Sequence, residues 1–182
     1  MIDAYRVQMP PVDLDRIVIG VDPAITKTSQ ADHTGIIIAG KKSTQNNISY
    51  YILDDCSLIG TPGEWATQVV RAFDRWQADR VVAEVNQGGD MVEATLRSLN
   101  ANLPIKTVRA TRGKIVRAEP VAALYEQGRV HHVGEFVELE EEMTSYTGEP
   151  GEASPDRMDA LVWALTELME ETEVNIGQFS FF

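Results

Sequence analysis

Residues 154–165, with the sequence SPDRMDALVWAL, decide the fold of this chain. Ser154 has a side chain that suits a helix N-cap, and Pro155 suits the first helical position. Asp156 and Asp159 lie three residues apart, so they share one face of the expected helix near the positive end of its dipole. The residues that follow are largely apolar, so we expect a buried helix that carries two acids in its first turns.

These two acids alone would fit a simple role in stabilising a helix start, but two upstream acids favour a functional site. Residues 16–22 (RIVIGVD) and 80–85 (RVVAEV) are short runs typical of buried strands, with Asp22 and Glu84 at or near their carboxyl ends. If the two strands are parallel neighbours, their ends lie about 4.8 Å apart. Ligand sites of open α/β sheets favour this edge.

Carboxylates gathered without matching cations cannot all stay ionised, and protonation or a divalent cation relieves their repulsion. Oxygen ligands suit Mg²⁺ or Mn²⁺. The sequence therefore predicts a metal site with Asp22, Glu84 and Asp159 as catalytic ligands, and with Asp156 as a fourth ligand or an outer-sphere group. Two ions about 3.5–4 Å apart would activate a water molecule and stabilise the leaving oxygen in phosphodiester cleavage.

The composition is that of an ordinary globular protein: 182 residues, 43% hydrophobic and 24% charged. A single cysteine, Cys56, excludes an internal disulfide and a cysteine-based zinc site, and it fits a reducing compartment. No apolar run approaches the roughly 20 residues of a membrane span, and no signal peptide is visible, so we expect a cytoplasmic protein with no membrane partner. We expect a lead-in or linker over residues 1–15, one domain over 16–172 and a flexible tail over 173–182.

The net charge of −12 argues at first against nucleic acid as a partner. Residues 97–117, however, contain six basic residues and no acid, which indicates a basic patch on an acidic body. An ordinary exposed helix surface is the alternative interpretation of this stretch. The residues that we expect to contact DNA are Arg109, Arg112, Lys114 and Arg117, with Lys27 on a separate long loop.

Hydrophobic periodicity and turn residues predict the remaining elements. Three strand-like runs come first with no helix between them, which indicates an antiparallel meander. Alternating helices and strands follow, so we expect an α/β fold: a mixed five-stranded sheet with helices on both faces. The predicted strands are residues 16–22, 34–42, 48–53, 80–85 and 105–109, with 130–133 as a short strand or extended piece. The predicted helices are residues 62–77, 90–100, 114–127, 136–146 and one that begins at 155.

Four motifs in this order resemble the nuclease domain of bacteriophage large terminase subunits. That domain belongs to the ribonuclease H-like superfamily, close to the Holliday-junction resolvases. The resemblance covers residues 16–169. The motifs that carry it are VIGVDPA with DHTGIII, then VVAEVNQGGDMV, TRGKIVRAEPVAALYEQGRVHH and SPDRMDALVWAL.

The resemblance implies metal-dependent endonuclease activity on concatemeric viral DNA during genome packaging. It places the family's metal-binding acids at Asp22, Glu84 and Asp159, and it places Asp156 where some relatives carry a His or Asp that also contacts metal. It implies double-stranded DNA, a portal and a small terminase subunit as partners, in the cytoplasm of the bacterial host. The phosphate-binding motif of the packaging ATPase is absent from this sequence, so we expect either an isolated nuclease domain or a relative that lacks the motor. We expect an isolated domain of this kind to be monomeric.

Three other functions compete with this interpretation. A Holliday-junction resolvase would use the same acids on a dimeric surface shaped for a junction. A phosphotransferase of the sugar-kinase or actin type needs a phosphate loop that Pro23-Ala24-Ile25 does not resemble. A DNA-docking or portal-docking module would carry the acids without catalysis. Side chains that we expect outside the site are Asp32 and His33 in a turn, His131 and His132 on opposite strand faces, and the core residues Trp65, Trp76 and Trp163.

Overall fold

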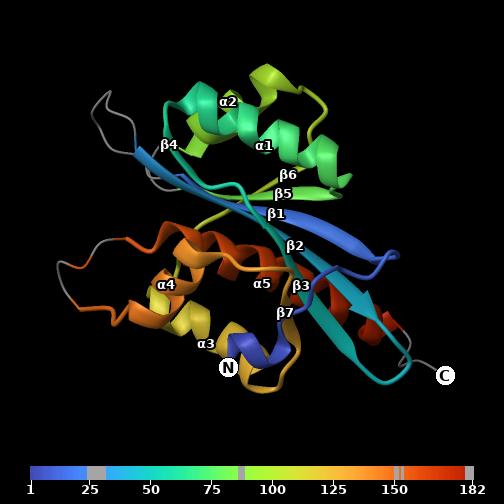
Figure 1. Cartoon of the computed structure of the whole chain (residues 1–182). Helices are drawn as coiled ribbons and strands as arrows, with labels where there is room; N and C mark the ends of the chain where they lie inside the picture. The colour runs from blue at the N-terminus through green and yellow to red at the C-terminus, as the bar shows by residue number, and fades with distance from the viewer. Residues whose placement is uncertain (24–31, 86–88, 150–151, 153, 179–182) are drawn as a thin grey trace.

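The fold has a central sheet between two layers of helices (Figure 1). The computed structural model describes residues 1–23, 32–85, 89–149, 152 and 154–178, with the backbone alone described at 32, 89–90 and 171–178. Helices α1 and α2 cover one face of the sheet, and α3, α4 and α5 cover the other. The helices are α1 (Pro62–Trp76), α2 (Gly89–Leu99), α3 (Lys114–Glu126), α4 (Val137–Ser145) and α5 (Asp156–Gln178), after a short 3-10 helix at Ile2–Tyr5.

The sheet confirms the predicted mixed topology, but among the described residues it contains seven strands rather than five. Strands β1, β2 and β3 are antiparallel, β5 and β6 run parallel to β1, and β7 runs parallel to β3. The strand order is β6-β5-β1-β2-β3-β7, and β4 pairs with β2. The strands are β1 (Arg16–Pro23), β2 (Asp32–Ser43), β3 (Ile48–Asp55), β4 (Leu58–Gly60), β5 (Arg80–Glu84), β6 (Ile105–Val108) and β7 (Val130–His132).

The two strands that raise the count, β4 and β7, have three residues each. Three residues are too few to show the alternation of apolar and polar side chains that marks a strand. The sequence pattern therefore predicts β7 only as a short strand or extended piece and does not predict β4. Both strands lie beside longer ones that were predicted, so the architecture is unchanged.

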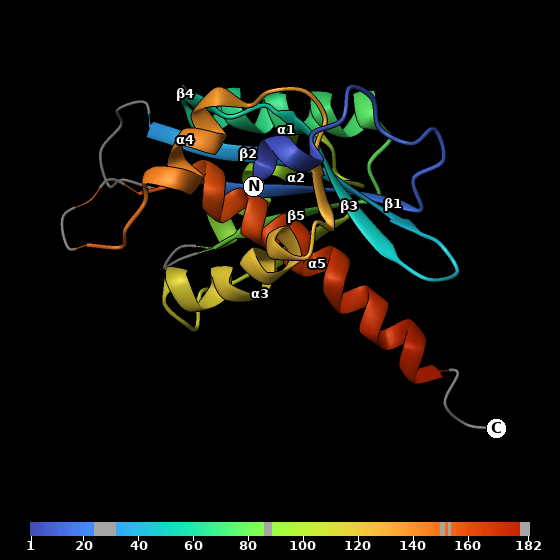
Figure 2. The same ribbon diagram turned by 60° about the horizontal axis from the view of Figure 1, so that its bottom comes forward.

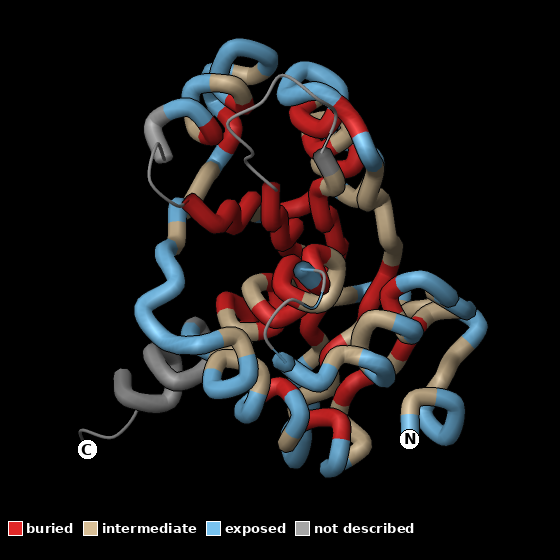
Figure 3. Tube along the Cα trace, turned by 90° about the vertical axis from the view of Figure 1, so that its left-hand side faces the viewer, coloured by how far each residue is buried: buried red, intermediate tan, exposed pale blue. Residues whose placement is uncertain are grey.

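Helix α5 is the structural centre of the lower layer. It crosses beneath the sheet, with α3 and α4 packed against it (Figure 2). Its apolar residues join the side chains of β1, β2 and β3 in one core, while α1 and α2 form a second core on the opposite face. Buried residues accordingly gather at the centre of the molecule, and the connecting loops are mostly exposed (Figure 3).

Two glycines allow the first turns of α5 to lie directly on the sheet. A Cβ atom at Gly20 of β1 would lie 2.0 Å from the carbonyl oxygen of Ala160. A Cβ atom at Gly35 of β2 would lie 2.0 Å from the carbonyl oxygen of Asp156. Any side chain at these positions would push the helix away, so the glycines set the height of Asp156 and Asp159 above the strands.

Secondary structure is present near both ends of the described chain. The backbone N–H of Val7 donates to the carbonyl of His132 at 2.9 Å, and Arg6 contacts Glu140 of α4 at 2.7 Å. The N-terminal residues therefore lie along the β7 edge. At the other end, α5 continues to Gln178, past residue 173 where we expected the tail to begin. The domain bounds and the flexibility of residues 173–182 remain predictions. Within the described parts of the chain, no helix has the length and apolar character that crossing a membrane requires.

Candidate active site

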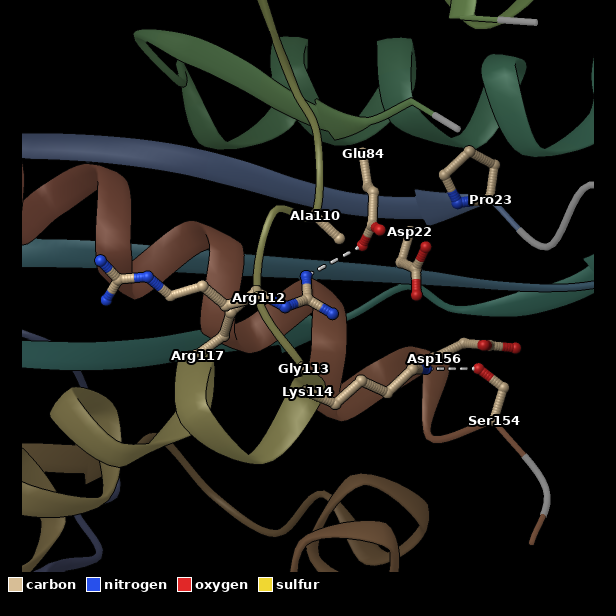
Figure 4. A pocket seen from close by; sticks show the side chains of 10 residues that line it. All are labelled: Asp22, Pro23, Glu84, Ala110, Arg112, Gly113, Lys114, Arg117, Ser154 and Asp156. Carbon is tan, nitrogen blue, oxygen red and sulfur yellow. Dashed lines mark hydrogen bonds and ion pairs between the residues drawn. The ribbon is translucent and has the colours of Figure 1, made fainter. Parts of the chain in front are cut away.

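Four buried acids meet at one edge of the sheet (Figure 4 shows three of them). Asp22 lies near the end of β1, and Glu84 is the last residue of β5. These strands are parallel neighbours, with Val21 opposite Ala83, so the two acids follow at the same edge. Asp156 and Asp159 come from the first turn of α5. The exposed fractions are 7% for Asp22 and Glu84, 5% for Asp156 and 2% for Asp159.

The acids repel one another strongly because they are buried together. Burial, together with the negative charges of Glu84, Asp159 and Asp156, raises the pKa of Asp22 to about 8. Burial also raises the pKa of Asp159, although Lys114 and Arg117 act in the opposite direction. The negative charge of the four acids therefore exceeds the positive charge that Lys114 and Arg117 bring to the site.

Two basic residues of α3 point into this acidic cluster. Lys114 Nζ donates to Asp159 Oδ2, and at 2.7 Å to Ser154 Oγ. Arg117 donates to Glu84 Oε2 at 3.2 Å and to Asp159 Oδ1 at 3.4 Å. Burial lowers the pKa of Lys114, but its contacts with Asp159 outweigh that effect, so the pKa is raised overall. Two residues that we expected at a DNA surface therefore serve as counter-ions to the acids.

Trp163 belongs to the site, although we expected it only in the core. Its indole Nε1 donates to Glu84 Oε2 at 2.6 Å. The guanidinium carbon of Arg117 lies 4.7 Å from the centre of the Trp163 ring system, a cation–π contact. The spacing from Asp159 to Trp163 is one helical turn, so the two residues share a face of α5. That spacing is the signal in the sequence that could have placed Trp163 here.

A second unpredicted contact fixes Asp156. His33 lies in β2 rather than in a turn, and its Nδ1 lies 3.0 Å from Asp156 Oδ2. The other ring nitrogen of His33 lies 2.6 Å from Arg157 Nη1, and Arg157 Nε donates to Asp55 Oδ2 at 3.1 Å. The imidazole therefore bridges an acid of the site and the arginine that follows it.

The other residues singled out in the sequence lie in three places. Arg109 and Arg112 are exposed, and Arg112 lines the cavity beside the acids. Lys27 lies outside the described residues. His132 is buried away from the site, where it contacts Tyr125 at 2.7 Å and Glu140 at 2.9 Å, so a shared ligand role with its neighbour does not arise.

The donor set suits a hard divalent cation. A cavity of about 410 Å³ is lined by Asp22, Glu84 and Asp156 together with Lys114 and Arg117. The acids are all oxygen donors, as Mg²⁺ and Mn²⁺ require, and their mutual repulsion is the condition that such a cation relieves. In the described part of the chain, no three acidic, histidine or cysteine side chains stand in a metal-binding arrangement. The ion pairs to α3 instead occupy oxygens of Glu84 and Asp159.

Comparison with protein families decides the identity of the fold. Residues 19–168 match the family model described as the terminase RNaseH-like domain. The chain belongs to this family. A search of curated protein sequences returns no match for the domain. The predicted ribonuclease H-like fold and the predicted terminase resemblance are thereby confirmed.

Solved structures show the same fold at low sequence identity. The large terminase nuclease from thermophilic phage G20c with bound cobalt has a TM-score of 0.60 and 16% identity, over 84% of this domain's chain and 81% of its own. The large terminase nuclease domain of bacteriophage SPP1 with bound Mn has a TM-score of 0.57 and 16% identity, over 86% and 88%. RuvC of Thermus thermophilus has a TM-score of 0.50 and 16% identity, over 84% and 92%.

Proposed function

We propose that this terminase domain is a divalent-metal-dependent endonuclease that cuts concatemeric viral DNA during genome packaging. The observation that carries the proposal is the buried cluster of four acids, in which the pKa of Asp22 is raised to about 8. Such a cluster is stabilised when a divalent cation replaces protons as its counter-charge. Bound Mn in the SPP1 nuclease and bound magnesium in the G20c nuclease support Mg²⁺ or Mn²⁺ as the metal.

In this proposal Asp22, Glu84 and Asp159 hold the metal, and Asp156 is a fourth ligand or an outer-sphere group. When bound, two such ions would activate water and stabilise the leaving oxygen of a phosphodiester. His33 holds one oxygen of Asp156, and Ser154 accepts a hydrogen bond from Lys114, so the surrounding residues restrict how the site can rearrange. These side chains orient the acids before DNA arrives.

The positive charges around the cavity provide a route for DNA to an acidic protein. Arg109 and Arg112 are exposed, and Arg112 is among the residues that line the cavity. We expect the double variant Arg109→Ala/Arg112→Ala to bind duplex DNA more weakly at every sequence, with a salt dependence flatter by about one unit per lost phosphate contact. Arg71→Ala, which removes an exposed arginine of α1, is the matched control and should leave the slope unchanged.

Family membership supports a wider setting for this activity. We propose double-stranded DNA as substrate, a portal and a small terminase subunit as partners, and the cytoplasm of the bacterial host as the place of action. The domain by itself would act as a monomer.

Plasmid cleavage tests the proposed reaction. The purified domain should nick and linearise supercoiled plasmid with Mn²⁺ or Mg²⁺, with little sequence preference, and should lose this activity in a chelator. Cleavage that persists in the chelator would contradict the proposal. A four-way DNA junction in the same assay separates the resolvase alternative, because a resolvase would cut the junction in preference to plain duplex. A domain that binds DNA but never cuts it would indicate a docking module instead.

A further inference from the structure

One oxygen of Glu84 receives two hydrogen bonds, each from a different helix. Trp163 Nε1 of α5 donates to Oε2 at 2.6 Å, and Arg117 Nη1 of α3 donates to the same oxygen at 3.2 Å. Arg117 also stacks over the Trp163 ring at 4.7 Å, so the two donors brace each other. Glu84 and Arg117 have side-chain exposures of 7% and 10%, so this arrangement is enclosed.

Two donors on Oε2 fix the plane of the carboxylate. The terminal torsion of glutamate is otherwise broad, and its two oxygens exchange freely. Within the described residues, no hydrogen bond is made to Oε1 of Glu84, and the side chain lines the cavity (Figure 4). Oε1 is therefore the oxygen left for a further ligand.

The chemistry of the two donors differs in a way that matters for a metal ligand. Arg117 carries a positive charge, which reduces the negative potential that attracts a divalent cation. The indole N–H of Trp163 carries no net charge, so it orients Glu84 without opposing the cation. A neutral donor is thus suited to hold a ligand in place both before and after metal binding.

We propose that Trp163 is a positioning residue, which holds Oε2 of Glu84 so that Oε1 is presented to the divalent cation. This inference rests on the proposed function, because it takes Glu84 as a metal ligand. Trp163 does not contact the reacting atoms; it acts through Glu84.

The test is Mn²⁺ affinity, measured from the paramagnetic resonance signal of free Mn²⁺. Trp163→Phe keeps a ring against Arg117 but removes the N–H, and we expect it to weaken Mn²⁺ binding about tenfold. Trp76→Phe is the matched control, since Trp76 also donates its indole N–H to a carboxylate, Asp54, at 3.2 Å. The control should bind Mn²⁺ as tightly as the wild type.

A double-mutant cycle separates positioning from packing. If Trp163 acts through Glu84, then Trp163→Phe should cause no further loss of Mn²⁺ affinity in a Glu84→Gln background. An equal loss in both backgrounds would overturn the proposal. Should Trp163→Phe fail to fold, 3-benzothienylalanine at position 163 preserves the shape of the ring system and lacks the N–H.

The outcomes distinguish this inference from the proposed function. Weaker Mn²⁺ binding in Glu84→Gln, with wild-type affinity in Trp163→Phe, would overturn the positioning role alone. Unchanged Mn²⁺ binding in Glu84→Gln would remove Glu84 as a ligand, and with it both proposals.

Discussion

Two of the buried acids of helix α5, Asp159 and Glu167, have surroundings that look alike at first. They lie eight residues apart on the same helix, and each side chain is only 2% exposed. Each contacts two basic side chains from neighbouring elements. Their pKa values nevertheless shift in opposite directions.

Glu167 forms a closed set of charges. It accepts hydrogen bonds from Arg80 at 2.6 Å and from Lys106 at 2.5 Å. Burial would raise the pKa of Glu167, but the two basic side chains outweigh burial and lower it. The negative charge of Glu167 is therefore balanced within the protein, and its ion pairs link α5 to β5 and β6.

Asp159 differs because other acids stand beside it. Burial and the charge of Glu84 raise its pKa in spite of the contacts with Lys114 and Arg117. Neither burial nor pairing with cations therefore separates Glu167 from Asp159, which we propose to bind metal. The difference between the two residues is that Asp159 lies beside other acids. Their combined negative charge is not balanced by Lys114 and Arg117.

The largest expected difference between the two acids is in DNA cleavage. Asp159→Asn should lower the plasmid cleavage rate by more than about 100-fold, because loss of a ligand costs more than loss of an outer-sphere partner. Glu167→Gln should cleave at nearly the wild-type rate. Rates are compared at saturating Mn²⁺ with protein that is folded by circular dichroism. Similar losses of cleavage rate in the two variants would contradict the proposed difference in function between Asp159 and Glu167.

Stability should show the reverse order. Glu167→Gln removes the buried negative charge that contacts Arg80 and Lys106, so we expect the free energy of unfolding to fall by about 1.5–3 kcal/mol. Asp159→Asn should cost less in the presence of EDTA, because it also relieves repulsion by Glu84. Urea unfolding of both variants measures this difference. A larger loss for Asp159→Asn would contradict the account.

The dependence of stability on pH should also differ between the two regions. The pKa of Asp22 is about 8 in the folded protein and 3.8 when unperturbed, so between these values the folded state holds more protons than the unfolded state. The free energy of unfolding without metal should therefore fall as pH rises from about 4 to 8, by at most about 1.4 kcal/mol per pH unit. Glu167 contributes to stability with the opposite dependence on pH. Its stabilising contribution is fully present above its ordinary pKa of 4.5, and it is lost as the pH falls through the lowered pKa of the folded state.

Urea unfolding in EDTA at several pH values tests this sign. The wild type should lose stability towards alkaline pH, and Asp22→Asn should lose less. The same decline in both proteins would mean that Asp22 does not carry the effect.

The smallest expected effect concerns the cations. Lys114→Met removes a positive charge that competes with metal for Asp159, so we expect Mn²⁺ to bind roughly fivefold more tightly. Lys106→Met removes the equivalent partner of Glu167 and should leave Mn²⁺ affinity unchanged. Calorimetric titration measures both. Weaker binding in Lys114→Met would mean that Lys114 supports the metal site rather than competing with it.

Much of this site was predictable from sequence because its acids sit at recognisable positions. Asp22 and Glu84 end apolar runs, and Asp156 and Asp159 follow a clear helix start. Each signal is local, and the rule that ligand sites favour the carboxyl ends of parallel strands brings them together. The four acids accordingly lie together in the structure, although their role as ligands remains a proposal.

The contacts among distant residues could not be predicted in the same way. Lys114 and Arg117 stand in an acid-free stretch, which favoured an outward-facing DNA surface. Their partners lie far away in the chain: Asp159 is 45 residues from Lys114, and Glu84 is 33 residues from Arg117. Their ion pairs to the acids predict that replacing either cation changes metal binding.

Trp163 and His33 were missed for a related reason. An aromatic residue in an apolar helix is most often a packing residue, and a histidine after a loop is most often solvated. Their polar atoms acquire a role only when α5 lies on the sheet over Gly20 and Gly35. That close approach is a property of the assembled fold rather than of any local pattern.

The central claim is that the surplus of acids exists to bind a divalent metal, and anomalous diffraction from a crystal soaked in Mn²⁺ tests it most directly. We expect one or two anomalous peaks among Asp22, Glu84 and Asp159, with Lys114 displaced from Asp159. A soaked crystal with no peak at these acids, and with the contact between Lys114 and Asp159 intact, would contradict it.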